Sequence, residues 1–392
     1  MRCDTDVDER DEAIGIRDGR IAYLGAAMNA PDASATLDLA GRLVLPGLVD
    51  PHTHLVFAGS RADEFARRMR GVDYHTIAAE GGGIASTVRA TRNASDAELL
   101  DLAQTRAEAL REHGVTSVEV KSGYGLDTEN ETRLLRVARE LGQLGIVRVT
   151  TSFLGAHAVP PEHKGDRAGY VRSVIDEQLP AVVAENLADA IDVYCDEGAF
   201  SLDEARAILE AGRAAGLRVR AHVGQFADLG GAELAAELGA CSADHLEQVS
   251  DAGLHAMAAA GTVAVFLPGA WRTLRQAAPR AERFRDAGVT MAIGTDLNPG
   301  TSPTSNLLLC AALAVRDAGM SADEALLGIT RHAARAAGID DVGSIRVGAH
   351  ADLAIYAVQS ASSLTYALGG VRANAVMLGG RMVVERASRS LW

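Results

Sequence analysis

Two histidines, His52 and His54, follow an apolar run that begins at Leu43. If this run is a strand, residues two apart project from the same face, so both imidazoles can reach one cation. Neutral imidazole is a good ligand for zinc or iron, and two such ligands leave a site that needs more. Because two histidines in a loop are also common by chance, the pair alone does not establish a metal site. The remaining ligands have to come from other parts of the chain.

The elements that follow alternate between strand-like and helix-like patterns. We expect helices over 95–113, 129–143, 168–188, 202–215, 231–238, 251–260, 279–287 and 304–318, with an apolar strand before each one after the first. The seventh strand is expected over 262–270, TVAVFLPGA. Together with the opening strand, the pattern predicts eight strands separated by helices. Such alternation is typical of a parallel sheet, and eight units favour an α/β fold of the (β/α)₈ TIM-like barrel type.

In such a barrel the catalytic groups lie at the C-terminal ends of the strands. Polar residues stand at most of the predicted strand ends, and five of the eleven histidines are among them. These residues are His52, His54, Tyr124, His157, Asp196, Glu197, His222, Gln225, Asp244, His245 and Asp296. A random distribution would not gather the histidines in this way, so the sequence predicts a functional site at one mouth of the barrel.

Four of these residues form a plausible set of metal ligands: His52, His54, His222 and Asp296. They offer three nitrogens and one carboxylate, which suits zinc or ferrous iron with a position left for water. Two-metal sites in similar barrels commonly need a carboxylated lysine at the end of a middle strand. The only lysines are Lys121, after the second strand, and Lys164, in a loop. We therefore expect one divalent ion, zinc or iron, per chain.

A bound divalent ion would lower the pKa of its water toward about 7 and make it a nucleophile. Asp296 could ligate the ion and also accept a proton from the attacking water. His245, at the end of the neighbouring strand, could hydrogen-bond the water or the developing oxyanion. The alternative for His245 is a purely structural hydrogen bond, and we favour the catalytic role because of its position at the barrel mouth.

The two ends of the chain differ from the middle. Residues 14–45 read as short strands around turns at Asp18-Gly19 and Ala40-Gly41, and strands return near the C-terminus around Gly379-Gly380. The pattern predicts that residues 1–45 and 345–392 pair into a small β-sandwich domain, while residues 46–344 form the barrel.

Composition excludes several classes of protein. Thirty-eight basic residues against 52 acidic ones give a net charge of −14, which argues against binding to nucleic acid. No apolar run is long enough to predict a transmembrane helix, and the acidic start does not resemble a signal peptide. The four scattered cysteines suit a reducing compartment. We expect a cytoplasmic protein with no membrane partner, and a homodimer is left open.

With its predicted metal ligands at strand ends of an eight-stranded barrel, the chain resembles the amidohydrolase superfamily and, more narrowly, its imidazolonepropionase family. The paired histidines and the Thr-Asp step at residues 295–296 are shared by the whole superfamily. The segments AGSRADEF, STVRATR, SGYGL and LGAHAVPPE are more specific and occur in the family's order. The resemblance covers essentially the whole chain.

The resemblance implies hydrolytic opening of 4-imidazolone-5-propanoate, a small anionic substrate, to N-formimino-L-glutamate in histidine degradation. It implies the same four metal ligands and a proton-handling role for His245. It also assigns substrate contacts to Arg61, Tyr124, His157, Gln225, Asn298, Gly300 and Thr301. A planar guanidinium such as that of Arg61 can pair both oxygens of the substrate's propionate. The alternative for Arg61 is an ion pair with Asp63 or Glu64 on the surface.

Two other functions stay open at this point. One is another cyclic-amide or amidine hydrolase, or a deaminase, on the same scaffold. The other is a binding protein without catalytic activity, although all the ligands expected of a mononuclear site are present. Gly224 and the run Trp271-Arg272-Thr273 depart from the usual pattern of the family, so the sequence leaves the effect on substrate preference undecided.

Overall fold

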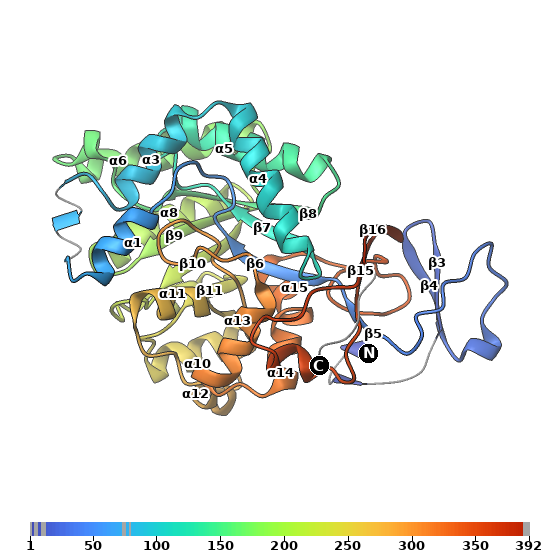
Figure 1. The fold of residues 1–392 in the computed structure, drawn as a ribbon. Coiled ribbons are helices and arrows are strands. Elements are labelled where there is room, and N and C mark those ends of the chain that lie inside the picture. The colour runs from blue at the N-terminus through green and yellow to red at the C-terminus, as the bar shows by residue number, and fades with distance from the viewer. Residues whose placement is uncertain (1, 4–6, 9–12, 73–75, 78–79, 387–392) are drawn as a thin grey trace.

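A barrel of parallel strands surrounded by helices lies beside a small antiparallel layer (Figure 1). The architecture comes from a computed structural model that describes residues 2–3, 7–8, 13–72, 76–77 and 80–386.

Eight strands form the barrel, and they follow one another around it in sequence order. They are β6 (Leu48–Thr53), β7 (Val115–Lys121), β8 (Arg148–Ala156), β9 (Ala190–Cys195), β10 (Arg218–Val223), β11 (Ser242–His245), β12 (Val263–Phe266) and β13 (Met291–Ile293). Every neighbouring pair is parallel. The prediction of a (β/α)₈ barrel is confirmed, because the C-terminal ends of all eight strands open on one mouth.

The barrel closes where the segment after β13 meets β6. The amide of Asp296 donates to the carbonyl of His52, and the amide of His54 donates to the carbonyl of Leu297; both N···O distances are 3.0 Å. The fully buried carboxylate of Asp50 accepts hydrogen bonds from the amide and the hydroxyl of Thr295. This seam places His52 of β6 and His54, just after it, directly beside Asp296.

Helices cover the outside of the barrel. In chain order they are α1 (Ala62–Met69), α3 (Ile84–Asn93), α4 (Asp96–Arg111), α5 (Thr128–Gln143), α6 (Arg167–Ser173), α7 (Leu179–Ala184), α8 (Leu202–Ala214), α9 (Gly231–Glu237), α10 (Asp251–Ala260), α11 (Pro268–Leu274), α12 (Ala281–Ala287), α13 (Leu307–Leu313), α14 (Ala322–Gly328), α15 (Arg331–Ala337) and α16 (Ser363–Tyr366). The described residues also contain two short 3₁₀ turns, η1 (Ala27–Asn29), which follows the hairpin of the small β region, and η2 (Pro161–His163).

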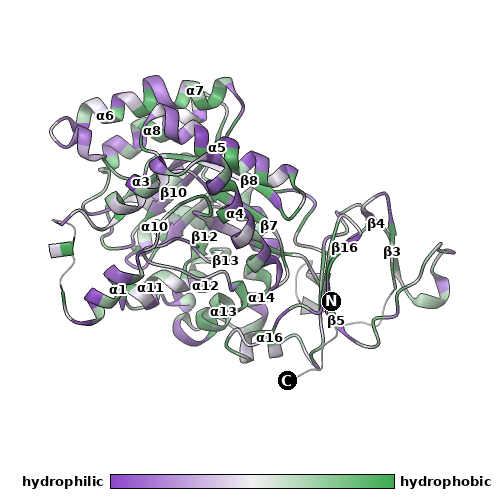
Figure 2. Ribbon diagram, turned by 45° about the horizontal axis from the view of Figure 1, so that its top comes forward, coloured by the Kyte–Doolittle hydropathy of each residue, from purple (hydrophilic) through white to green (hydrophobic). Residues whose placement is uncertain are grey.

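Helical periodicity explains how these helices pack. In α4 the buried residues are Leu99, Ala103, Ala107 and Leu110, which form one stripe against the strands. Ser95 caps this helix, because its hydroxyl accepts a hydrogen bond from the amide of Glu98. Figure 2 shows hydrophilic residues on outer helices such as α1 and hydrophobic ones on α13. The outward faces are therefore polar, and the core lies between helices and strands.

Three expected elements differ in detail. The seventh strand ends at Phe266 instead of residue 270, because Pro268 lacks an amide hydrogen and starts α11. The predicted helices 168–188 and 304–318 each contain a π-helical turn, η3 (Val174–Gln178) and η4 (Ala314–Ala318). Pro180 accounts for the first, since it cannot donate the regular bond to the preceding turn.

Strands from both ends of the chain form the small antiparallel sheet, in the order β16-β15-β14-β5. These strands are β5 (Leu43–Pro46), β14 (Leu353–Tyr356), β15 (Ala375–Leu378) and β16 (Arg381–Glu385). The register of β14 against β5 pairs Leu353 with Pro46 and Tyr356 with Leu43. The predicted pairing of the two ends is confirmed.

A hairpin of β3 (Ala13–Arg17) and β4 (Arg20–Gly25) adds a second layer. Its turn at Asp18-Gly19 has positive φ at both residues, as predicted. Ile21 packs into an apolar cluster with Leu353 of the four-stranded sheet. A further pair, β1 (Arg2–Cys3) and β2 (Val7–Asp8), precedes it. The domain boundaries at 45/46 and 344/345 stay a prediction.

Two other expectations meet the structure here. Residues 36–39 form no strand, because the Asp38 carboxylate accepts a hydrogen bond from the amide of Ala40 and makes a turn instead. Among the described residues, no helix is long and apolar enough to cross a membrane. Cys195, Cys241 and Cys310 are free thiols.

Candidate metal centre

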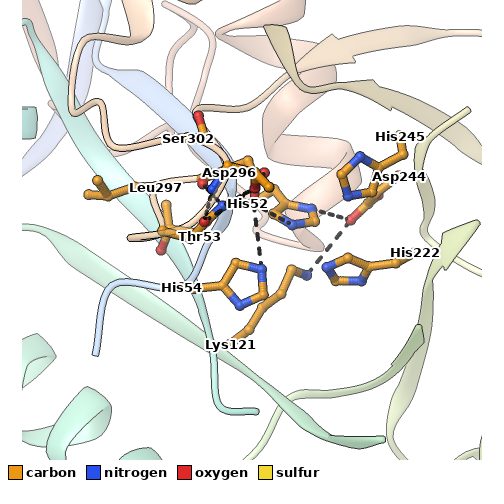
Figure 3. A network of polar contacts seen from close by, with 12 residues as sticks. His52, Thr53, His54, Lys121, His222, Asp244, His245, Asp296, Leu297 and Ser302 are labelled. Atoms are coloured by element: carbon orange, nitrogen blue, oxygen red, sulfur yellow. Dashed lines mark hydrogen bonds and ion pairs between the residues drawn. The ribbon is translucent and has the colours of Figure 1, made fainter. Parts of the chain in front are cut away.

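Three histidine rings converge at the mouth of the barrel (Figure 3). The ring centres of His52 and His222 are 4.5 Å apart, those of His52 and His54 are 5.4 Å apart, and those of His54 and His222 are 5.6 Å apart. Two rings come from β6 and the segment that follows it, and the third comes from β10 on the far side of the barrel. Closure of the barrel therefore brings together residues that are far apart in sequence.

Asp296 completes the predicted set. Its Oδ1 lies 3.5 Å from Nε2 of both His52 and His54. Asp296 has a φ of 52°, a left-handed conformation that aspartate tolerates better than most residues. Burial raises the pKa of its carboxyl to about 6, although His245 and His222 pull that pKa down. A carboxylate with a raised pKa is suited to accept a proton near neutral pH.

The donor atoms divide into two groups that share His52. One group contains His52, His54 and Asp296, and the other contains His52, His222 and His245, with donor atoms within 4.8 Å of one another in each. Each of the four predicted ligands therefore lies in one or the other of these groups, and the second group also contains His245.

The free nitrogen atoms fit a cation. Nε2 of His52 and Nε2 of His222 are buried and make no hydrogen bond to the described residues. Burial lowers the pKa of His52 and of His54 well below the ordinary value, so both rings are neutral. A neutral imidazole with a free nitrogen in a buried site is the form that binds zinc or iron.

Two carboxylates orient these rings. Oδ2 of Asp244 lies 2.7 Å from Nδ1 of His52, and Oδ1 of Asp192 lies 3.1 Å from Nδ1 of His222. A hydrogen bond at Nδ1 directs Nε2 to the metal. Sequence reasoning missed Asp192, because it considered only the residues at strand ends. The available signal was a charged residue inside the otherwise apolar strand β9.

His245 has unusual geometry and a buried acidic neighbour. Its φ is 80°, and that of Leu246 is 68°, so the chain turns sharply at the end of β11. The fully buried carboxylate of Glu247 lies 3.8 Å from Nδ1 of His245. Burial lowers the pKa of His245, but the interaction with Glu247 outweighs it and the net pKa is raised. Sequence reasoning did not assign a role to Glu247.

Tyr124 and His157 line the site next to His54. The ring of His157 stacks on that of His54 at 5.0 Å between centres, and Tyr124 lies 5.3 Å from His157. Nδ1 of His157 lies 2.9 Å from the carbonyl of Gly123. Burial lowers the pKa of His157 to about 3, so the ring is neutral and Nδ1 is the donor. Both predicted residues are therefore at the mouth of the barrel.

The loop that carries Tyr124 is held by a residue that the sequence did not reveal. The buried carboxylate of Glu131 accepts hydrogen bonds from the amides of Gly123, Gly125 and Leu126, at 2.7–3.1 Å. The clue in the sequence was an acid on the inner face of a helix directly after a glycine-rich loop.

Asn298 and Thr301 organise the loop after Asp296. The Asn298 carbonyl oxygen accepts the amides of Gly300 and Thr301, and its amide group donates to the carbonyl of Asp296. The Thr301 hydroxyl lies 3.4 Å from the Asp296 carboxylate. In Gln225, the side-chain oxygen accepts the hydroxyl of Tyr194. The side chains of Asn298 and Gln225 therefore already have protein partners.

Arg61 begins the helix α1 at the edge of the same site. Its Nε donates a hydrogen bond to the Glu64 carboxylate at a distance of 2.9 Å. The ion pair with Glu64, which was the alternative to substrate binding by Arg61, therefore does form. The pair is mostly buried, and Glu64 also accepts bonds from Gly83 and Ser86. A Cβ built on Gly300 would overlap Nη1 of Arg61. The guanidinium thus lies against the loop that follows Asp296.

Comparison with known proteins decides the family. The profile of the Amidohydrolase family matches residues 43–383. A protein from Shewanella sp. (strain ANA-3) named "Imidazolonepropionase" is 48% identical over 378 residues, which cover 95% of this chain and 92% of that protein. A second one, from Shewanella baltica (strain OS155 / ATCC BAA-1091), is 47% identical over the same shares. The chain belongs to the imidazolonepropionase family of amidohydrolases.

Solved structures of more distant proteins show the same fold. A 5-methylcytosine deaminase from Klebsiella pneumoniae has a TM-score of 0.77 at 16% identity, covering 98% of this chain and 97% of that one. An adenosine deaminase from Xanthomonas campestris with bound zinc has a TM-score of 0.70 at 21% identity, covering 98% and 91%. At such identities the likeness concerns the fold alone. The family is metal-dependent, and this member of it has the buried donor groups that a metal needs.

Proposed function

We propose that the chain is an imidazolonepropionase that opens 4-imidazolone-5-propanoate to N-formimino-L-glutamate in histidine degradation. The observation that carries this proposal is the 48% identity over 95% of the chain. The convergence of His52, His54, His222 and Asp296 at one mouth of the barrel also supports it, because these donor groups suit a metal-dependent hydrolase.

We propose one divalent ion, zinc or iron, held by these four residues. The donor set favours either metal, because it combines three imidazoles with one carboxylate. A bound ion supplies Lewis acidity, which lowers the pKa of a ligated water and polarises the carbonyl group under attack. The buried Nε2 atoms of His52 and His222, which make no hydrogen bond to the described residues, are the strongest support for this assignment.

In the reaction, water adds to the ring carbonyl carbon and the ring carbon–nitrogen bond breaks. The carbonyl carbon becomes a carboxylate, and the departing nitrogen takes a proton and becomes part of the formimino group. Asp296, with its raised pKa, is suited to accept the proton of the attacking water. His245, whose pKa is raised by its interaction with Glu247, is suited to stabilise the oxyanion and to protonate the departing nitrogen.

Substrate selection rests on the propionate arm. In a protein of net charge −14 the overall field does not attract an anion, so a local cation has to hold it. Arg61 is the proposed cation, with Tyr124 and His157 beside the ring, and Gln225, Asn298, Gly300 and Thr301 around the remaining edge. The proximity of Arg61 to Gly300 supports this placement.

Consumption of imidazolonepropionate by the purified protein, followed by ultraviolet absorbance, tests the proposal. N-formimino-L-glutamate should form in equal amount. The control substrates are 5-methylcytosine and adenosine, because proteins of the same fold act as deaminases. Turnover of a control substrate, with none of imidazolonepropionate, would reject the proposal in favour of a deaminase.

A further inference from the structure

Five charged side chains form a layer inside the barrel, directly beneath the proposed metal site. They come from four strands and are Glu119, Lys121, Asp192, Arg220 and Asp244. At most 1% of each side chain is exposed. Barrel interiors are usually filled with branched apolar side chains, so a charged layer here requires a reason.

Lys121 lies at the centre of this layer. Its Nζ is 2.7 Å from Asp192, 3.1 Å from Glu119 and 3.7 Å from Asp244. Figure 3 shows the Lys121 side chain reaching up between His54 and His222 toward Asp244. Lys121 is the last residue of β7, so its side chain enters the barrel instead of leaving the strand in a loop.

Two of the carboxylates connect Lys121 to the proposed ligands. Asp192 uses one oxygen for Lys121 and the other for Nδ1 of His222. Asp244 contacts Nδ1 of His52 through the same oxygen that faces Lys121. Each of these imidazoles is therefore one carboxylate away from the ammonium group, and the Nε2 atoms stay free for the ion.

The same two carboxylates and His222 form a third possible metal group. Donor atoms of Asp192, His222 and Asp244 lie within 4.8 Å of one another. The ammonium of Lys121 already lies 2.7 Å from Asp192 and 3.7 Å from Asp244, and it would repel a second cation between them. Carboxylation of Lys121, as in a two-metal site, would instead place another negative charge against three carboxylates.

We propose that Lys121 is a positioning residue whose ammonium acts as the resident cation of the Asp192–His222–Asp244 group. It holds the two carboxylates on Nδ1 of His52 and His222, and it keeps a second metal ion out. This inference rests on the metal site of the proposed function, but not on the identity of the substrate.

The test is metal affinity in Lys121→Met, which keeps most of the length of the side chain and removes its charge. Metal-free protein is titrated with Zn²⁺ against a chromophoric chelator. We expect Kd for Zn²⁺ to rise about 10- to 100-fold, as for loss of partners that orient ligands. The matched control is Lys164→Met, at the only other lysine, which is exposed in a loop and should bind as the wild type does.

Removal of a buried charge can prevent folding, so a second variant is part of the design. Lys121→Met combined with Asp192→Asn returns the layer to its original net charge and should fold more readily. It should bind Zn²⁺ more weakly than Asp192→Asn alone, because the ammonium is absent. The wild-type chain should bind one equivalent of Zn²⁺ tightly.

An affinity for Zn²⁺ in Lys121→Met equal to that of Lys164→Met, or in the double variant equal to that of Asp192→Asn alone, would overturn the inference, even if stability fell. Two tightly bound ions in the wild type would overturn it as well. A wild type that binds Zn²⁺ more tightly than Lys121→Met but does not consume imidazolonepropionate would reject the proposed substrate and leave the role of Lys121 standing.

Discussion

The floor and the rim of the candidate site are held by different kinds of interaction. The floor, formed by the charged layer beneath His52 and His222, is held by ion pairs between side chains of different strands. The rim, formed by the loops at the barrel mouth, is held by side chains that accept backbone amides. The difference follows from position, because strands have already paired their backbone groups whereas loops have not.

In three rim loops, a side-chain oxygen accepts hydrogen bonds from backbone amides in this way. Glu131 accepts amides of the Tyr124 loop, Asp196 accepts those of residues 225–227, and Asn298 accepts those of Gly300 and Thr301. We infer that the floor determines metal binding and that the rim determines substrate binding. Variants of the two regions should therefore fail in different measurements.

The largest effect should come from the ligands themselves. His222→Ala and Asp296→Asn should each remove most activity and most bound metal, because three ligands do not hold an ion and its water in the same geometry. Asparagine is chosen at position 296 because it tolerates the positive φ. Chelation of the wild type should have the same effect and be reversed by Zn²⁺ or Fe²⁺. Full activity after complete metal removal would contradict the metal assignment.

A variant of His245 separates the loss of catalysis from the loss of the metal ion. His245→Asn, which also tolerates a positive φ, should lower kcat by roughly 10²- to 10⁴-fold through loss of acid–base catalysis. Metal content, measured on the same preparation, should be unchanged. Loss of the ion together with activity would instead make His245 a ligand, as its group with His52 and His222 allows.

A variant of Arg61 tests substrate binding at the rim. Arg61→Ala should raise KM by roughly 30- to several-thousand-fold at unchanged metal content, since loss of a partner from a desolvated ion pair costs about 2–5 kcal/mol. Gly300→Ala should raise KM in the same direction but less, because its methyl group displaces the guanidinium without removing it. If kcat/KM of Arg61→Ala stayed within a few-fold of the wild type, Arg61 would be only the partner of Glu64.

The smallest effect should come from Glu131, whose carboxylate accepts hydrogen bonds from amides of the Tyr124 loop. Glu131→Gln keeps the oxygen that binds Gly125 and Leu126, so KM should rise only about 2- to 12-fold, the value of one hydrogen bond. Glu131→Ala leaves buried amides unpaired and should also lower Tm. Arg206→Ala, which breaks an exposed ion pair with Glu237, is the control and should change neither KM nor Tm. An unchanged KM in Glu131→Ala would remove Glu131 from the rim.

The sequence by itself determined the barrel and most of the residues around its mouth. Alternation of apolar strands and amphipathic helices is a local pattern, and it predicted all eight strands. Because parallel strands in a barrel all end at the same mouth, the strand ends also predicted that His52, His222 and Asp296 lie together. The turn at Asp18-Gly19 was predicted for an equally local reason, since few residues tolerate positive φ.

Tertiary structure alone decided how these residues are oriented. Asp192 contacts His222 and Asp244 contacts His52 across 30 and 192 residues of sequence, contacts that exist only once the strands are paired. The placement of Lys121 among three carboxylates has the same origin. Periodicity specifies which face of a strand a side chain occupies, but not which side chain of another strand it meets. The partners, and with them the nitrogen atom that each imidazole presents to a metal, depend on the closed barrel.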